Sequence, residues 1–459
     1  MLPFIAFLVC FSLSGFAQEK PVSYYHDLVP VLKRSCTGCH HPGKLKGDLD
    51  LTSYEALKKG GKHGESFFPT DPKKGTLLEN ITGDEPDMPK EGDPLTKAEV
   101  AAFERWIVEG AKDDTPEEAK NPFKLAKSPD YHAPPVISAM AYSPDGTVLA
   151  VSGYHEVLLH KPDGTGLTGR LLGESPRVES IAFSSDGKQL MVAGGAPSRF
   201  GEIQIWDVAA QTQLKSFKIS SDSLYGATFS PDGKKIALGA ADKLVRVISA
   251  EDGKELVKFD NHSDWTFGAV FTRNGGRILS CSRDKAMKLI DVSNGQFIDD
   301  VNKLLEGILC FARNPMDDVV AYGGELGTPR IYRISDNQNR GAGDTARDAN
   351  LVRELERQPF PVHAISWSPD GGRVGVGTSG ESRLYSVADG KRTATLPGND
   401  GAIFAIAFHP ANHQVATGGF DGKVRIFDSA SGNLVTNFIP VTITPAKQVA
   451  AVSSERPEK

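Results

Sequence analysis

The sequence predicts a multidomain protein in which a small all-α domain is followed by a larger all-β domain. A length of 459 residues allows two to four domains, and a hydrophobic content of 39% is enough for folded cores. Glycine and proline are abundant, at 47 and 29 residues, which favours many tight turns. The two predicted domains meet in a charged, proline-bearing stretch at 115–132, which we interpret as a linker.

The first 17 residues have the pattern of a signal peptide. An apolar run covers residues 4–11, and Gly15 and Ala17 place small residues at positions −3 and −1 of a cleavage site before Gln18. We therefore expect an exported protein. The alternative interpretation of this stretch is a buried N-terminal strand.

Composition and charge exclude two classes of partner. No apolar run approaches the roughly 20 residues that cross a bilayer, so we expect no membrane span. The formal net charge is −6, which gives no basic field for nucleic acid. Residues 18–114 hold 14 basic and 18 acidic residues, a net charge of −4, and this acidity favours basic surfaces on partner proteins.

Residues 18–114 contain one sharp motif, Cys36-Thr37-Gly38-Cys39-His40. The C-x-x-C-H spacing indicates covalent attachment of one haem c, with a thioether at each cysteine and His40 as the proximal iron ligand. Three alternatives remain: a zinc site, a redox-active cysteine pair and a structural disulfide. A zinc site lacks a second ligand pair, a redox pair lacks its βαβ context, and a disulfide does not need His40.

Met88 is the predicted distal ligand of the haem iron. It follows His40 by 48 residues, in a loop stiffened by prolines, and its thioether is a soft ligand for haem iron. The other downstream candidate is His63, whose glycine-rich neighbours favour an exposed loop instead. His41 directly follows the proximal residue and cannot reach the opposite face.

Two helices are expected to flank the haem motif. Residues 27–34 carry an apolar face that leads into it. A second helix begins with the capping box Thr96-Lys97-Ala98-Glu99 and stops at Gly110. We expect Trp106 on this helix to form one wall of the haem crevice, and the pair Phe67-Phe68 to line another.

Residues 28–110 resemble the planctomycete-type cytochrome c domain. The resemblance implies that Cys36 and Cys39 bind haem, with His40 proximal and Met88 distal. Members of this family often carry a second proline where Lys90 stands, and they are often fused to other modules, including propellers. The stretches that carry the resemblance are Val29-Pro30-Val31-Leu32, Gly47-Asp48-Leu49-Asp50-Leu51, Tyr54-Glu55-Ala56-Leu57, Lys59-Gly60-Gly61, Met88-Pro89 and Trp106-Ile107-Val108-Glu109-Gly110-Ala111.

A repeat of about 40 to 45 residues begins near residue 133, which is the signature of a β-propeller. Each copy runs strand, turn and strand, and then adds an alternating strand and an outer strand, so seven copies predict seven four-stranded blades. With Trp206-Asp207 and with Asp242, Asp284 and Asp421 before third strands, the repeats resemble degenerate WD40 units over 133–440. The seven anchors are Ala139–Gly146, Ile181–Gly187, Ala227–Gly233, Ala269–Gly275, Leu309–Pro315, Ile365–Gly371 and Ile406–Pro410.

The repeats offer no catalytic constellation. Cys281 and Cys310 fall on neighbouring repeats, and we expect two buried free thiols, with a disulfide as the alternative. A polar insertion at 336–344 is expected to be a surface loop. Six histidines are expected at the surface or in turns: His155, His160, His262, His363, His409 and His413.

These observations predict an exported, periplasmic bacterial haem protein that transfers single electrons and docks protein partners on its propeller. The expected limits are 1–17 for the signal peptide, 18–114 for the cytochrome domain, 115–132 for the linker, 133–445 for the propeller and 446–459 for a C-terminal tail. We expect an electron carrier rather than an enzyme, with redox proteins as partners. The alternatives are a propeller scaffold whose haem is structural or sensory, and a haem peroxidase if Met88 is not a ligand.

Overall fold

The protein divides into two compact units between Pro122 and Phe123 in a computed structural model. The described residues are 20–42, 44–302, 305–335 and 349–445. The expected signal peptide, the polar insertion at 336–344 and the C-terminal tail lie outside them.

The first unit is mainly helical, with one short hairpin next to the predicted haem motif. The hairpin pairs His40 with Leu45 and His41 with Lys44, and it is the departure from an all-α domain. Its elements are η1 (Tyr24–Leu28), α1 (Val29–Ser35), β1 (His40–His41), β2 (Lys44–Leu45), η2 (Lys46–Asp48), α2 (Tyr54–Lys59), α3 (Thr76–Ile81) and α4 (Lys97–Val108), with α5 (Glu117–Lys120) at its end.

The capping box predicted for the second helix is confirmed. The Thr96 hydroxyl accepts a hydrogen bond from the Glu99 amide, and the Glu99 carboxylate accepts one from the Thr96 amide. This reciprocal pair satisfies two amide donors that the first turn leaves without helical partners. The helix ends at Val108, and Gly110 follows with a φ of 101°.

An aromatic cluster forms the core of the first unit. Trp106 on α4 stacks on Tyr24 with ring centroids 5.5 Å apart, and it contacts Phe67 at 4.8 Å. The Trp106 indole N–H donates to the Lys112 carbonyl at 3.0 Å, so its polar atom is satisfied inside the core. These contacts hold α4 against the N-terminal helices.

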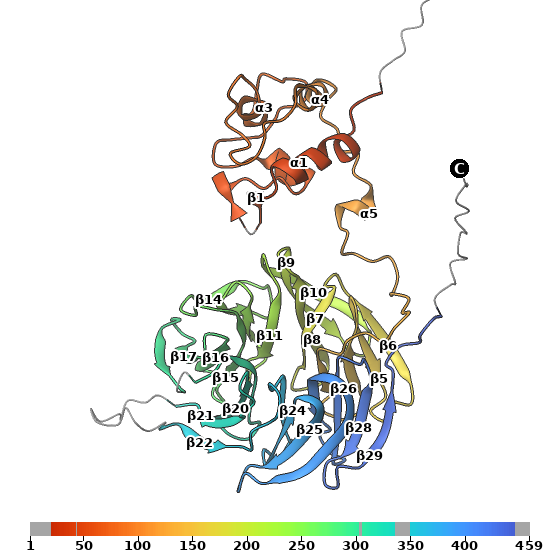
Figure 1. Cartoon of the computed structure of the whole chain (residues 1–459), viewed down its shortest axis with the longest axis vertical. Coiled ribbons are helices and arrows are strands. Elements are labelled where there is room, and N and C mark those ends of the chain that lie inside the picture. The colour runs from red at the N-terminus through yellow and green to blue at the C-terminus, as the bar shows by residue number, and fades with distance from the viewer. Residues whose placement is uncertain (1–19, 43, 303–304, 336–348, 446–459) are drawn as a thin grey trace, which may run out of the picture. The chain divides into compact units, whose positions relative to one another are not determined.

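The second unit consists of antiparallel sheets arranged around a common centre (Figure 1). Five sheets have four strands each, and one has seven. In the large sheet, the first half of β26 pairs with β25 and its second half with β27. Within each sheet every strand pairs with the next one in the chain, as expected for repeated hairpin units.

The strands of the second unit are, sheet by sheet, β3 (Met140–Tyr142), β4 (Leu149–Ser152), β5 (Glu156–His160) and β6 (Leu167–Leu172); β7 (Arg177–Phe183), β8 (Gln189–Ala196), β9 (Phe200–Asp207) and β10 (Thr212–Ser220); β11 (Leu224–Phe229), β12 (Lys235–Ala240), β13 (Val245–Ser249) and β14 (Glu255–Phe259); β15 (Thr266–Phe271), β16 (Arg277–Ser282), β17 (Met287–Asp291) and β18 (Phe297–Asp300); β19 (Ile308–Arg313), β20 (Val319–Gly324), β21 (Arg330–Arg333) and β22 (Leu351–Glu354); β23 (Ala364–Trp367), β24 (Arg373–Gly377), β25 (Ser379–Ser386), β26 (Arg392–Phe408), β27 (Gln414–Gly419), β28 (Val424–Asp428) and β29 (Leu434–Phe438).

The repeated turn after each first strand explains the Ser-x-Asp-Gly signature. In the first copy the Ser143 hydroxyl donates to the Asp145 carboxylate at 2.5 Å, and Asp145 accepts from the Thr147 amide at 3.0 Å. These bonds hold the pKa of Asp145 below its usual range. Gly146 takes a φ of 73° there, which a side chain would make costly.

The first strands of successive sheets contact one another in order, and β26 returns to contact β3. Where the ends of this unit meet, the Ile137 amide donates to the Gly419 carbonyl at 3.0 Å. Tyr131 forms a parallel bridge with Ile443, so residues on both sides of the repeats contribute to the closure.

Candidate functional site

The haem motif follows directly on the end of α1. Cys36 is the residue after the helix, and its amide donates to the Leu32 carbonyl at 2.9 Å. The amides of Cys39 and His40 both donate to the Cys36 carbonyl at 3.1 Å. The chain therefore makes a tight turn through the motif, with both thiols and the imidazole on one cavity wall.

That wall belongs to a cavity of about 540 Å³ inside the first unit. The predicted haem residues Cys36, Cys39, His40 and Met88 all line it. The volume falls in the range of about 300 to 1,000 Å³ that is usual for cofactor sites. Residues separated by up to 52 positions in sequence thus meet at one cavity, as the haem prediction requires.

The apolar part of the cavity comes from residues on either side of the motif. Leu77 and Ile81 project from α3, while Leu49 and Leu51 follow the hairpin. Such side chains exclude water from a bound aromatic macrocycle and lower the local dielectric.

The short helix α3 also positions the distal loop. The Met88 amide donates to the Asn80 carbonyl at 2.9 Å, which ties the loop to the last turn of this helix. Met88 is half-buried and packs against the core of the unit. Its sulfur-bearing side chain is therefore held at the cavity by a defined backbone contact.

The donor set fits a covalently held haem. Both cysteines are free, and burial raises the pKa of the Cys36 thiol to about 11. His40 is 9% exposed, and its Nδ1 atom has no hydrogen-bond partner within the described residues. Two free thiols and an imidazole with an unpaired Nδ1 atom on one cavity match the chemistry that haem c requires.

His63 reaches the same cavity, although its side chain is exposed. Its exposure agrees with the loop that the glycine-rich sequence predicts. His41 lies on β1 and does not line the cavity.

The cavity margin is basic, in contrast to the acidic first unit as a whole. Arg34, Lys44, Lys46 and Lys90 line it, against the single acid Glu91. Arg34 is paired with Glu99 at 2.8 Å and Lys90 with Asp87 at 3.0 Å. Lys44 and Lys46 make no ion pair among the described residues, so they dominate the local charge.

The predicted aromatic walls are wrong. Trp106 and Phe67 belong to the aromatic core and do not line the cavity, and Phe68 is 38% exposed. The face of α4 that carries Trp106 packs against Tyr24 instead. The wall residues that sequence reasoning missed, Leu77 and Ile81, lie on a helix of six residues that is too short for a clear periodic pattern.

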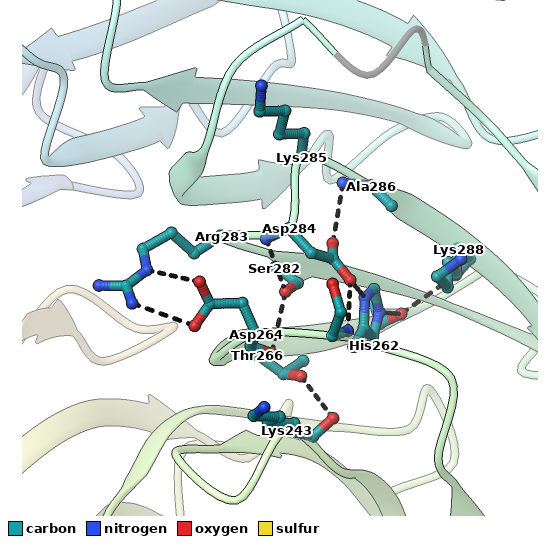
Figure 2. Close-up of polar contacts among 12 residues, drawn as sticks. Lys243, His262, Asp264, Thr266, Ser282, Arg283, Asp284, Lys285, Ala286 and Lys288 are labelled. Atoms are coloured by element: carbon teal, nitrogen blue, oxygen red, sulfur yellow. Dashed lines mark hydrogen bonds and ion pairs between the residues drawn. The ribbon is translucent and has the colours of Figure 1, made fainter.

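A Ser–His–Asp cluster occurs in the second unit (Figure 2). The Nδ1 atom of His262 lies 2.8 Å from the Asp284 carboxylate, and its Nε2 atom lies 2.8 Å from the Ser280 hydroxyl. All three side chains are buried, with Ser280 at 0% exposure. The Ser280 hydroxyl also donates to the Lys288 carbonyl. The cluster connects the loop before β15 to β16 and to the turn that follows β16.

The expectation that the propeller histidines lie at the surface or in turns is wrong for His160, which is buried on β5. His155, His262 and His409 lie in connections between strands, as expected, but they are buried as well. His155, His160, His262 and His409 are between 3% and 8% exposed. His160 and His409 contact backbone carbonyls of distant residues at 3.0 Å. They therefore join one sheet to another. His413 is exposed, as expected.

Cys281 and Cys310 are both free thiols, as expected, but only Cys281 is buried and Cys310 is half-buried. Cys281 is fully buried, and burial raises the pKa of its thiol well above the ordinary value. The thiol of Cys310 is directed to the carbonyl of Val362 at 3.4 Å.

Two family comparisons agree with this division of the chain. Residues 36–92 match the model described as Planctomycete cytochrome C. Residues 177–454, more than half of the chain, match the β-propeller model described as Nucleolar protein 10-like, N-terminal domain. The chain belongs to this β-propeller family. It joins a planctomycete cytochrome c domain to a WD-repeat propeller, which confirms both resemblances.

Curated WD repeat-containing proteins match part of this chain. The F-box-like/WD repeat-containing protein TBL1X of Mus musculus is 28% identical over 148 residues, 31% of this chain and 27% of that protein. WD repeat-containing protein 1 of Rattus norvegicus is 31% identical over 118 residues, 25% of this chain and 18% of that protein. The matched segments thus span about a quarter or less of these relatives.

The described residues contain neither a candidate membrane span nor a candidate metal cluster. No helix there is long and apolar enough to span a membrane. No group of three or more histidine, cysteine, aspartate or glutamate residues there is placed to hold a metal ion.

Proposed function

We propose that this protein is an exported one-electron carrier whose cytochrome domain holds one haem c and whose propeller docks protein partners. The observation that carries the proposal is the convergence of two free thiols, a buried imidazole and a thioether on one cavity. Residues 18–114 would form the cytochrome domain and residues 133–445 the propeller, joined by the linker at 115–132.

Each of the four residues has a separate role in this proposal. Cys36 and Cys39 would hold the haem covalently as thioethers, and His40 and Met88 would be its axial ligands. A haem ligated by histidine and methionine supplies one-electron exchange at a raised potential. The hydrogen bond from the Met88 amide to the Asn80 carbonyl would keep the distal loop in place.

The composition of the cavity favours electron transfer over catalysis. If His40 and Met88 both held the iron, the haem would keep no open coordination site for peroxide. Glu91 is the single acid on the described cavity lining, and it sits at the basic margin. A peroxidase would need an acid–base group beside an open position.

The propeller assignment adds a docking surface to the carrier. We propose seven blades, with β26 shared between the last two, because each half of this strand pairs with a different neighbour. Export to a bacterial periplasm would agree with residues 1–17 as a signal peptide and with covalent haem attachment.

Optical spectra of the full chain, made in a host that matures c-type haem, test this proposal. We expect a low-spin haem with a methionine-to-iron charge-transfer band in the oxidised protein. Met88→Ala should abolish the band, whereas Met316→Ala, at an exposed methionine of the second unit, should leave it unchanged.

A third variant separates the two candidate distal ligands. His63→Ala should leave the spectrum unchanged. If it, rather than Met88→Ala, produced a high-spin haem, Met88 would not be the ligand. A wild-type protein with a high-spin resting haem would contradict the electron-transfer proposal and favour a peroxidase-like activity.

A further inference from the structure

A second cavity, of about 500 Å³, lies at the centre of the propeller. Residues from the first strands of all its sheets line the cavity, together with residues that immediately precede two of these strands. It is built wholly within the second unit and shares no residue with the haem site.

The same register position supplies the cavity lining from strand to strand. In each repeat, one of the lining residues lies four positions before the last residue of the innermost strand, for example Glu179 before Phe183. At five of these positions the strand pairing skips a residue, which is the mark of a β-bulge. Bulges redirect a side chain away from the regular pleat. The resulting set, here called the bulge ring, is Ser138, Glu179, Tyr225, Phe267, Leu309, His363 and Phe404.

The bulge ring combines one carboxylate with several aromatic faces. Tyr225 and Phe267 lie with ring centroids 5.3 Å apart, and Phe404 packs against His363 at 5.7 Å. Glu179 is the only acid among the residues that line this cavity. A carboxylate among aromatic faces is an environment that attracts organic cations.

The Glu179 carboxylate has no partner in the described part of the chain, and the residue is half-buried. Burial raises its pKa, while the nearby charge of Arg177 acts in the opposite direction without forming an ion pair. A half-buried acid without a partner carries a desolvation cost that a bound cation would offset.

Three acids of the propeller that are more deeply buried than Glu179 all have hydrogen-bond or ion-pair partners. Arg170 forms two bonds to Glu156, at 2.8 and 2.6 Å. Glu202 accepts bonds from two serine hydroxyls and an amide, and Glu306 pairs with Arg330 at 2.5 Å. The fold therefore satisfies its structural carboxylates, and Glu179 stands apart because it faces the cavity.

We infer that the bulge ring binds a guanidinium or ammonium group, supplied by an arginine or lysine side chain of a protein partner. The carboxylate of Glu179 would accept its hydrogen bonds, while Tyr225, Phe267 and Phe404 contact its charge and its apolar stem. This inference rests on the proposal that the propeller docks proteins, and it names the side-chain chemistry that is recognised. It does not depend on the ligands or redox behaviour of the haem.

Calorimetric titration of the haem-loaded full chain tests the inference. The probes are a nine-residue peptide with a central arginine, Nα-acetyl-arginine methylamide and the uncharged Nα-acetyl-citrulline methylamide. We expect the peptide to bind most tightly, the arginine derivative more weakly and the citrulline derivative not at all. Equal binding of the two small probes would overturn the role of charge. Equal binding of the peptide and the arginine derivative would contradict a ligand that is part of a protein chain, and would favour a small free guanidinium compound.

Two variants and a control connect the binding to the bulge ring. Glu179→Gln should weaken peptide binding by about tenfold or more, because a charged hydrogen bond is lost. Phe267→Leu should weaken it by about threefold through the loss of an aromatic face. Glu251→Gln, at an exposed turn away from the cavity, should change nothing. Thermal unfolding of each variant identifies any that misfold, and unchanged affinity in a folded Glu179→Gln protein would refute the inference.

Discussion

The two cavities of this molecule are assembled in different ways. The haem cavity is lined by residues 34–91, a single stretch in which a motif, a hairpin and a short helix lie close in sequence. The propeller cavity is lined by residues that share one register position but are spread over residues 138–406 of the chain. Chemistry in the first can be recognised from local spacing, whereas chemistry in the second appears only when the repeats are in register.

The largest expected effect is the loss of haem attachment at the first cavity, while the second cavity stays unchanged. In a protein with Cys36→Ser and Cys39→Ser we expect complete loss of covalent haem, because no thiol remains for a thioether. Mass spectrometry of the full chain should show one haem in the wild type and none in the double variant. Cys310→Ser should retain the haem, and its loss there would show that the two units are not independent.

A large effect on stability is expected from a buried ion pair of the propeller. Glu306 is fully buried against Arg330. Replacing Arg330 by Met leaves an uncompensated buried charge, at a cost of about 3 to 5 kcal/mol. The exposed pair of Lys391 and Asp389 is the control, and Lys391→Met should change stability by about 1 kcal/mol or less. Denaturant unfolding followed by tryptophan fluorescence measures both, and equal effects would contradict the distinction.

A smaller and pH-dependent effect is expected at the buried Ser–His–Asp cluster. Although burial alone would raise it, the pKa of Asp284 is lowered to about 2 by its bonds to His262 and to backbone amides. Because the folded pKa is depressed, the stabilisation is present above about pH 4, the ordinary value for aspartate, and is lost as pH falls through 2.

The variant Asp284→Asn isolates this contribution. It should cost about 2 kcal/mol at pH 7, since hydrogen bonds to a charged group are lost. The difference from wild type should shrink between pH 4 and pH 2 in unfolding experiments. A difference independent of pH would mean that the carboxylate charge contributes nothing.

The smallest expected effect concerns the basic margin of the haem cavity. The double change of Lys44→Glu and Lys46→Glu should slow oxidation by hexacyanoferrate(III) severalfold at low salt, because the anion is no longer attracted. The change should vanish near 1 M salt, where the Debye length is about 3 Å. Lys112→Glu, which does not line the cavity, is the control for stopped-flow measurements. An unchanged rate in the double variant at low salt would show that the two lysines do not attract the anion.

Much of the haem cavity could be predicted from the sequence, because its decisive residues carry distinctive chemistry. Cys36, Cys39, His40 and Met88 were identified from motif spacing and the soft thioether, and they meet at one cavity. The wall could not be predicted, since α3 has only six residues. The prediction for Trp106 is wrong because the apolar pattern of its helix shows which face is buried but not what that face packs against.

The propeller repeats could be predicted from their turns, but the bulge ring could not. Glu179 and Phe404 are 225 positions apart and share no motif, so their proximity depends on strand register and on bulges. The buried histidines escaped prediction for a similar reason. His160 lies on β5 and His409 directly follows β26, and each contacts a segment more than 260 residues away in the chain.

An equilibrium redox titration of the full chain, followed optically, tests the central claim of one-electron transfer most directly. The account predicts a single reversible transition of one electron, with a low-spin haem in both states and no change on adding cyanide. A resting haem that is high-spin, binds cyanide and turns over peroxide would contradict it.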